Sequence, residues 1–522
     1  MTAPRHAEPR GLLALLVTMC AALALVIGAA SSLSLALPDI AEATGATQTE
    51  LTWVVNIYAL VFAALLLPVG IAADRWGRRQ FLVAGLAVFA AASVASGLVD
   101  QPELIIALRG LAGVGAAAVM PATLSVLVDA FPDDRRPQAV AIWAAVSGAG
   151  AMVGILTSGL LVENFWWGSV QVVYGAAAAV VALVCLVNVP TSRNPELRMD
   201  PAGSVLSFAG LSALVYGLIE GPERGWTDLV TLIALAAGSA LLVGFVVHEL
   251  RTRNPMLEVR LFRSAGLSTG SAMVFLQFFA AFGFFFLAPQ WLQYVHRLEP
   301  LETALWLTSL TAGIGPAARF GPQLVARFGS APVGAWGMAQ MAVAFVMFAL
   351  QKDGDISLWM FALALVVLGF GFGLAINPGT TLIIDGLPED RRTLAAAVND
   401  VTREVGGALG SAVAASVLLA VYGDQVLSGV SGIPEPAVQA SEEGVAQAVE
   451  AAGQLEQAQS APLIRSAVEA FANGYAAAMW VGAATLLVGA VVVVLAGRRR
   501  TSPVNADVHS RAEDSGELTA AR

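Results

Sequence analysis

The sequence has 522 residues, of which 57% are hydrophobic and only 13% are charged. Soluble domains carry about 25% charged residues, so water is not the main solvent of this chain. The formal net charge of -10 comes from acids at loop ends, in residues 422–474 and near the C-terminus, which indicates solubilising charge and gives no sign of a nucleic-acid partner. Cys20 and Cys185 lie inside separate apolar runs, so neither a disulfide nor a metal site is expected.

Apolar runs of about 20 residues, each long enough to cross a bilayer as a helix, recur from residue 12 to residue 496. They predict an all-α polytopic membrane protein with fourteen transmembrane helices. In chain order these are expected at about 12–37, 51–73, 80–98, 103–128, 138–161, 168–189, 203–219, 228–247, 267–290, 301–325, 332–350, 357–384, 395–421 and 475–496. The first apolar run follows a short N-terminal segment and is similar to a signal peptide in this respect. Because further apolar spans follow it, we interpret it as helix 1.

Basic residues are distributed unevenly between the predicted loops. With the N-terminus in the cytoplasm, 21 of the 28 Lys and Arg residues fall in inner segments. The basic residues in outer segments are Arg224, Arg297, Lys352 and Arg465. This positive-inside bias predicts an even number of helices, with both termini on the cytoplasmic side of a bacterial inner membrane.

One long segment, residues 422–474, falls on the outer side and is rich in Ala, Gln and Glu. Its apolar residues at helical spacing are Val438, Val445, Val449 and Ala452. This spacing predicts a helical hairpin that rests on the outer surface. The composition leaves a flexible acidic loop as the alternative.

Two parts of the chain repeat one another. Residues 121–154 run from P-A-T-L through F-P-D-D-R-R to a glycine-rich stretch, and residues 378–410 run from P-G-T-T through L-P-E-D-R-R to another. The repeat predicts two pseudo-symmetric six-helix bundles. The expected domains are 1–190 for the first bundle, 191–263 for inserted helices 7 and 8 with their linkers, 264–500 for the second bundle with the outer loop 422–474, and 501–522 for a disordered cytoplasmic tail.

Small residues occupy corresponding places in the two repeats. The glycines are Gly150, Gly154 and Gly159 on predicted helix 5, and Gly406 and Gly410 on predicted helix 13. Glycines at such spacing let two membrane helices approach closely, so we expect helix crossings at these positions.

The loop between predicted helices 2 and 3 reads G-I-A-A-D-R-W-G-R-R at 70–79 and resembles the cytoplasmic loop motif of the major facilitator superfamily. Helix 4 carries R-G-L-A-G-V-G-A-A at 109–117, which is similar to that superfamily's helix-4 arginine motif. Over its whole length the chain resembles the superfamily's 14-helix drug:proton antiporter branch, the multidrug exporters of the EmrB/QacA type. The resemblance implies export of lipophilic, cationic small molecules such as drugs, antiseptics and dyes in exchange for protons.

In the loop motif, an acid beside a helix end and nearby arginines can form a clamp that latches the two halves in one conformation. The motif residues are Gly70, Asp74, Arg75, Gly77, Arg78 and Arg79. The alternative is that the arginines only hold the loop on the cytoplasmic side of the membrane, as the positive-inside rule describes. That alternative accounts for the arginines but not for the acid or the glycines.

Arg109 lies several residues inside predicted helix 4, where an unpaired arginine costs at least ~2.5 kcal/mol, so it needs a partner or a wet cavity. A snorkelling arginine near the outer surface is the alternative. The family resemblance implies an aspartate on helix 1 as the natural partner, but Ala29 stands in that place.

On helix 5, Ile155 and Ser158 replace a proline and a glycine of the family's antiporter signature, so this helix supports antiport weakly.

The stretch N-D-V-T-R-E-V-G-G at 399–407 places three charges in predicted helix 13. Glu404 lies about nine residues in, roughly 14 Å along the helix and near the membrane midplane. Asp400 shares its face at i,i+4, and Arg403 follows Asp400 at i,i+3. The corresponding repeat positions are the uncharged Ala144, Ser147 and Gly148. We expect Glu404 to carry protons, with Asp400 and Arg403 tuning it and Arg109 completing the coupling set; a static buried salt bridge is the alternative.

Helix 9 carries phenylalanines at helical spacing that predict an aromatic wall for flat cations, although such stripes often pack against other helices. The expected cavity residues are Asn56, Tyr58, Phe278, Phe282, Phe286, Gln290 and Asn377.

Other activities lack a sequence basis. The chain has one lysine and no G-x-x-x-x-G-K motif, so no nucleotide partner is expected. His248-Glu249 has no second histidine four residues on, and no nucleophile with a base is recognisable, so we expect neither an enzyme nor a cofactor. The expected partners are a small-molecule substrate, protons and the lipid bilayer. Export of an endogenous metabolite, antibiotic or siderophore, or a transport-dead membrane receptor, remains as the alternative.

Overall fold

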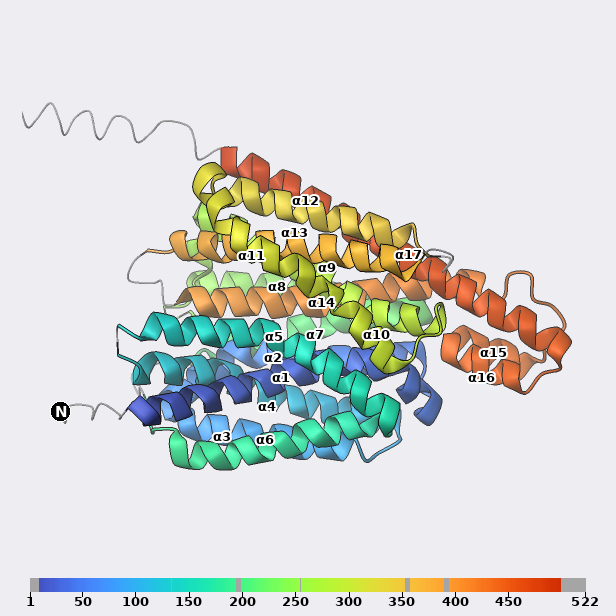
Figure 1. The fold of residues 1–522 in the computed structure, drawn as a ribbon, viewed down its shortest axis with the longest axis horizontal. Helices are drawn as coiled ribbons and strands as arrows, with labels where there is room; N and C mark the ends of the chain where they lie inside the picture. The colour runs from blue at the N-terminus through green and yellow to red at the C-terminus, as the bar shows by residue number, and fades with distance from the viewer. Residues whose placement is uncertain are drawn as a thin grey trace, which may run out of the picture.

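The computed structural model describes residues 9–132, 134–193, 199–253, 255–352, 357–388 and 394–498. Within these ranges every regular element is a helix, which confirms the all-α prediction. Long helices lie side by side along the long axis of the molecule (Figure 1). The predicted tail 501–522 lies outside the described residues.

The first half of the chain forms six long helices that pack on one another. They are α1 (Pro9–Thr44), α2 (Gln48–Trp76), α3 (Arg78–Ser96), α4 (Pro102–Ala130), α5 (Arg136–Asn164) and α6 (Gly168–Asn188). The start of α2 is fixed by a capping box, in which Thr47 Oγ1 accepts from the Glu50 amide and Glu50 Oε2 accepts from the Thr47 amide. Gly77, at φ +137°, makes the tight turn into α3, and this backbone conformation favours glycine.

The inserted pair consists of α7 (Pro201–Arg224) and α8 (Leu229–Arg251), followed by the short 3₁₀ helix η1 (Val259–Arg263). The side chains of Asp200 and Asp228 cap the two long helices. Besides α8, helix α7 packs on α2 of the first half and α14 of the second, so the pair lies against the seam between the halves.

The second half, α9 to α17, contains the remaining helices. They are α9 (Ala265–Tyr294), α10 (Pro300–Leu307), α11 (Ser309–Phe328), α12 (Ser330–Ala349), α13 (Leu358–Asp385), α14 (Leu394–Gln425), α15 (Glu435–Glu443), α16 (Val445–Gly453) and α17 (Gln457–Arg498). The start of α1 and the end of α17 lie at the same end of the molecule, which we call the terminus end (Figure 1). Helices α15 and α16 mark the opposite end, the cap end.

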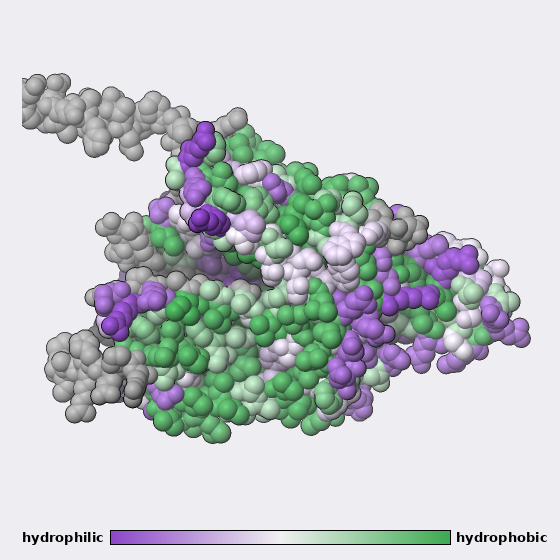
Figure 2. Space-filling view, viewed as in Figure 1, coloured by the Kyte–Doolittle hydropathy of each residue, from purple (hydrophilic) through white to green (hydrophobic). Residues whose placement is uncertain are grey.

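Twelve of the described helices are long and apolar enough to cross a membrane. Helix α5 is not among these twelve, and its described side chains include the apolar stretch Ala149–Asn164. The predicted helix 301–325 is divided at Thr308 into α10 and α11, and α11 carries Arg319 and Arg327 with two internal prolines. Fourteen membrane spans therefore stay a prediction. Apolar side chains nevertheless cover the middle of the bundle (Figure 2).

The segment 422–474 is helical, as predicted, but it is built differently from a simple hairpin. It comprises the end of α14, then α15, α16 and about the first five turns of α17, which begins at Gln457 instead of at 475. Its buried face includes Val445, Ala448 and Ala452, whereas Val449 is exposed. The predicted apolar face was wrong at this position, because the buried face of α16 runs through Val445, Ala448 and Ala452 at i, i+3 and i+7, and Val449 lies beside it.

The two halves touch mainly toward the cap end. The bonds that join them there include Gln48 Nε2 to Gln290 Oε1 (3.2 Å), Gln293 Nε2 to the Leu35 carbonyl (2.9 Å), the Leu301 amide to Glu163 Oε2 (3.1 Å) and Ser411 Oγ to Asn56 Oδ1 (2.5 Å). Toward the terminus end, Figure 2 shows the surface hollowed between the halves.

Candidate functional site

Helix α14 carries a buried ion pair where the two halves meet. Arg403 Nη2 and Nε donate to Glu404 Oε1 at 2.9 and 3.0 Å, and Glu404 is 6% exposed. Asp400 lies one turn earlier on the same helix. The guanidinium carbon of Arg403 is 5.7 Å from the ring centroid of Phe278 on α9, and its Nη2 lies 3.6 Å from Met120 Sδ on α4 of the first half. The predicted charged cluster is thus assembled at the seam.

This pair marks the limit of the contact between the halves. Between described residues, the hydrogen bond nearest the terminus end that joins the halves is the one from Arg403 to Met120. Glu404 lies ten residues after the start of α14, about 15 Å along the helix, close to the predicted depth. The ion pair therefore lies part-way along α14, where this helix of the second half contacts α4 of the first.

Arg109 on α4 is enclosed by protein and only 1% exposed, so it is not a surface arginine. Its Nε donates to the Val54 carbonyl at 3.2 Å, and its guanidinium carbon lies 4.4 Å from the ring centroid of Tyr58. Its Nη1 and Nη2 have no hydrogen-bond partner among the described residues. Ala29, which stands where the family resemblance implies an acid, is fully buried in α1.

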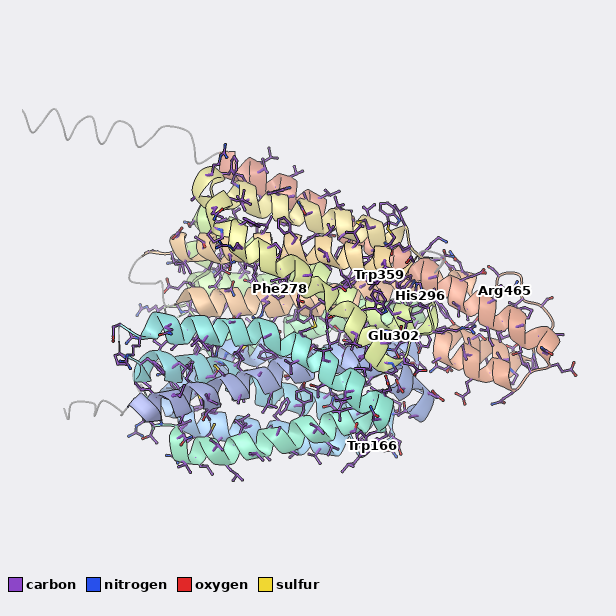
Figure 3. The ribbon with its side chains drawn as sticks, viewed as in Figure 1. Trp166, Phe278, His296, Glu302, Trp359 and Arg465 are labelled. Atoms are coloured by element: carbon purple, nitrogen blue, oxygen red, sulfur yellow. The ribbon has the colours of Figure 1, made fainter. Side chains whose placement is uncertain are left out.

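The predicted cavity residues divide into two groups. Phe278 and Phe282 are partly exposed and Asn377 is exposed, and Figure 3 labels Phe278 near the middle of the bundle. The ring of Phe278 lies 5.4 Å from that of Phe372 on α13, at an interplanar angle of 69°. These residues from α9 and α13 form the aromatic surface that remains accessible.

The other predicted cavity residues are packed into the closed contact instead. Asn56 is fully buried and bonds Ser411 across the seam, and Gln290 bonds Gln48 in the same way. The Tyr58 hydroxyl donates to the Val26 carbonyl at 3.0 Å. Phe286 is likewise 1% exposed. In this conformation Asn56 and Gln290 join the two halves, Tyr58 and Phe286 are buried, and none of the four lines an open cavity.

Sequence analysis missed three residues of this contact. Ser411 follows Glu404 by seven residues, two turns along one face of α14, and this spacing was a usable signal. Gln48 and Met120 gave no such signal, because their partners lie far away in the chain.

The loop motif of α2 and α3 forms a compact charge network. Arg78 Nε donates to Asp74 Oδ1 at 2.5 Å, and Arg78 Nη1 pairs with Asp129 at the end of α4. The Arg78 amide also donates to the Ser192 carbonyl in the linker to α7, at 3.2 Å. All of these contacts stay within the first half and its linker, so the charges fasten the inner ends of three helices to one another.

The predicted glycines lie at close helix crossings. A Cβ on Gly154 would meet the Gly28 carbonyl of α1 at 2.4 Å, and one on Gly410 would meet the Phe279 carbonyl of α9 at 1.9 Å. These two crossings are equivalent in the two repeats. Gly150 lies against Ala24 of α1, Gly406 against Phe275 of α9, and Gly159 against α10 of the other half.

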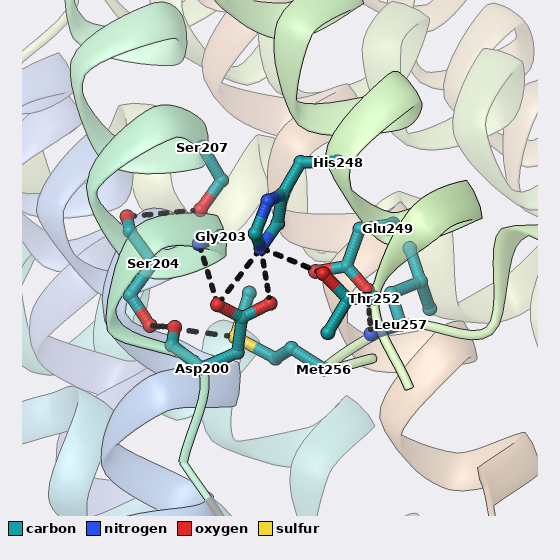
Figure 4. A network of polar contacts seen from close by, with 9 residues as sticks. All are labelled: Asp200, Gly203, Ser204, Ser207, His248, Glu249, Thr252, Met256 and Leu257. Atoms are coloured by element: carbon teal, nitrogen blue, oxygen red, sulfur yellow. Dashed lines mark hydrogen bonds and ion pairs between the residues drawn. The ribbon is translucent and has the colours of Figure 1, made fainter. Parts of the chain in front are cut away.

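A second polar cluster lies away from the seam, at the terminus ends of α7 and α8 (Figure 4). His248 Nε2 lies 2.9 Å from Asp200 Oδ2, and Glu249 Oε2 accepts from the Leu257 amide at 3.1 Å. These contacts fasten the inserted pair to the loop that precedes η1. The described residues contain no group of three or more His, Cys, Asp or Glu residues that could hold a metal ion.

Comparisons with known proteins agree with this architecture. Residues 17–411 match the family model of the Major Facilitator Superfamily. The multidrug resistance protein Stp of Mycobacterium tuberculosis is 32% identical over 392 residues, which cover 74% of this chain and 72% of Stp. The multidrug efflux pump LfrA of Mycolicibacterium smegmatis is 32% identical over 485 residues, which cover 90% of this chain and 92% of LfrA.

The same arrangement of helices occurs in a solved structure. A bacterial homologue of the human lysosomal transporter Spinster, in an inward-facing and unoccupied conformation, superposes with a TM-score of 0.67 at 16% identity, over 94% of this chain and 98% of the other. The family match and the relatives confirm the resemblance deduced from the motifs and the expectation that the protein is not an enzyme. The chain is a transporter and belongs to the Major Facilitator Superfamily.

Proposed function

We propose that the protein exports lipophilic, cationic small molecules in exchange for protons. The observation that carries this proposal is the buried Glu404–Arg403 pair at the seam between the halves. Ionisable groups inside a membrane bundle are costly and are retained mainly for function. When Glu404 takes up a proton it loses its charge and its hold on Arg403, so proton binding changes the contacts between α14, α4 and α9.

Transport then follows by alternating access. Residues 1–190 and 264–500 form the two bundles that rock about the seam, with fourteen membrane spans in all and residues 191–263 as the inserted pair. The contacts near Asn56 and Gln290 close the outer side, and the hollow at the terminus end faces the cytoplasm. The start of α1 and the end of α17 at one end of the molecule, together with the arginine-rich inner loops, support a bacterial inner-membrane protein with cytoplasmic termini.

The site offers separate places for the two cargoes. Glu404 carries the proton, with Asp400 and Arg403 adjusting its proton affinity and Arg109 supplying a fixed positive charge in the first half. Phe278, with Phe282 and Asn377 beside it, provides the accessible aromatic surface, which attracts flat cations through its ring faces. The relatives' printed names, a multidrug resistance protein and a multidrug efflux pump, support drugs as the substrate class.

The loop motif is proposed to act as the conformational clamp. Its residues are Gly70, Asp74, Arg75, Gly77, Arg78 and Arg79. In the present conformation Arg78 joins Asp74 to Asp129, so the inner ends of α2, α3 and α4 move as one block. A rigid block is what a rocking movement needs at its inner edge, because a loose helix end would absorb the motion.

The test is proton-driven uptake of a fluorescent lipophilic cation into everted membrane vesicles. Wild type should accumulate the dye when the vesicle interior is acidified, and Glu404→Gln should lose this uptake while still binding the dye. Glu103→Gln, a change of an exposed acid in the first turn of α4, is the matched control and should transport normally. If wild type moves no cation under a proton gradient, drug antiport gives way to metabolite export or to a receptor without transport.

A further inference from the structure

The guanidinium of Arg109 is enclosed by α1, α2 and α4. It is 1% exposed, its Nε is satisfied by the Val54 carbonyl, and Nη1 and Nη2 point at no acceptor among the described residues. An arginine does not lose its proton in a protein, so this charge persists. The Tyr58 ring at 4.4 Å offsets part of its burial but supplies no opposite charge.

The acids of the three enclosing helices lie near the helix ends and away from Arg109. They are Asp39 and Glu42 on α1, Glu50 and Asp74 on α2, and Glu103 and Asp129 on α4. Glu50 caps its own helix, and Asp74 and Asp129 hold Arg78. Glu103 lies nearest along α4 and is exposed one and a half turns earlier, in the first turn of the helix. Among described residues no carboxylate pairs with Arg109.

The second half does not supply the missing charge either. Glu404 accepts two bonds from Arg403, its neighbour on α14. A buried cation with two unpartnered NH₂ groups and no protein anion requires a counter-ion that the chain itself does not provide.

We propose that Arg109 binds a small monovalent anion from solution. Chloride is the most abundant anion of this kind. One positive charge with two unpartnered NH₂ groups, Nη1 and Nη2, matches a single spherical anion that accepts from both. Tyr58 links the site to α1, because its hydroxyl donates to the Val26 carbonyl, one turn before the fully buried Ala29. Two small buried residues, Ala112 and Ala116, follow Arg109 on the same face of α4 at i+3 and i+7.

This inference deepens the proposed role of Arg109 in coupling, but anion binding is measurable without transport. Purified full-length protein is held at constant ionic strength while gluconate is replaced by chloride, and both the melting temperature and ³⁶Cl⁻ binding are recorded. Because a ligand that binds only the folded protein stabilises it by mass action, wild type should show a saturable rise in Tm, on the order of a few degrees, with matching ³⁶Cl⁻ binding.

Variants then locate the site. Arg109→Gln should lose both the chloride-dependent Tm rise and ³⁶Cl⁻ binding, whereas Arg319→Gln, a change of an exposed arginine on α11, should keep them. Ala29→Asp should lose chloride dependence for the opposite reason, because its carboxylate supplies the charge permanently. Its Tm in gluconate should then exceed that of Ala29→Asn, which adds the same volume without the charge.

Three results would overturn the proposal. In the first, wild type shows no chloride effect. In the second, the effect survives in both Arg109→Gln and Ala29→Asp, which would place the anion elsewhere. In the third, chloride does not raise the Tm of wild type, but a substrate carrying a carboxylate raises the Tm of wild type and not that of Arg109→Gln. Arg109 would then bind the substrate and not a free anion. If Arg109→Gln does not fold, the comparison of Ala29→Asp with Ala29→Asn decides.

Discussion

Arg403 and Glu404 are adjacent in sequence, and adjacent side chains on a helix leave it about 100° apart. Their ion pair forms because the long arginine side chain bends back to place both Nε and Nη2 on one carboxylate oxygen. A contact that depends on one flexible side chain can break without moving the helix. On the Glu404 carboxylate a proton can therefore replace Arg403 more easily than it could replace a partner held at i,i+4 on the same helix face.

Phe278 should set the affinity for cationic substrates. Its ring lies near the Arg403 guanidinium and remains partly exposed, so Phe278→Ala removes a cation–π contact and should raise KM about 2- to 30-fold, equivalent to roughly 0.5–2 kcal/mol. The measurement is dye uptake against concentration in everted vesicles. Phe284→Leu is the control, because Phe284 is fully buried among other rings and should lower Tm with little change in KM. An unchanged KM in Phe278→Ala would remove the aromatic surface from the substrate site.

At the scale of the helix, composition predicted most of what the structure contains. Hydropathy located the long helices, because a chain in lipid must satisfy its backbone within each helix. It did not locate the break at Thr308, which keeps helical dihedrals, or the early start of α17 at Gln457 in a polar stretch. The Glu404 cluster was recognisable because charges in an apolar run are rare. The sequence did not reveal whether Asn56 lines a cavity or closes one, because its partner Ser411 is 355 residues away in the chain.

The crossing of α14 with α9 depends on Gly410. A Cβ there would lie 1.9 Å from the Phe279 carbonyl, so Gly410→Ala must push two backbones apart and should cost about 1–3 kcal/mol. Gly423 on the same helix has nothing within 4 Å of an added Cβ, and Gly423→Ala should be neutral or slightly stabilising, because alanine is the better helix former. Melting temperatures of the purified variants compare the two. Equal stabilities would mean that the crossing is looser than the structure shows.

For the molecule as a whole, the hydrogen bonds of Asn56 and Gln290 join the halves toward the cap end, and the surface is hollowed between the halves toward the terminus end. In alternating access, the opposite conformation has the cap end open and the terminus end closed. The bond between Asn56 and Ser411 cannot survive that movement, because α2 belongs to one half and α14 to the other. The inserted α7, which packs on both, must release one of them.

A reversible cross-link across this seam should therefore stop transport. Both native cysteines are buried, so a Cys20→Ser, Cys185→Ser background is suitable for introducing Asn56→Cys with Ser411→Cys. A short bis-methanethiosulfonate linker, which forms a disulfide with each cysteine and releases methanesulfinate, should abolish dye uptake in everted vesicles, and cleavage of the two disulfides by a reducing thiol should restore it. Ser31→Cys with Ala151→Cys joins α1 to α5 within the first half, where Ser31 Oγ bonds the Ala151 carbonyl at 2.9 Å, and its cross-link should leave uptake intact. Full uptake by the linked Asn56–Ser411 pair would show that α2 and α14 stay together during the cycle, so the opening would have to occur along another pair of helices.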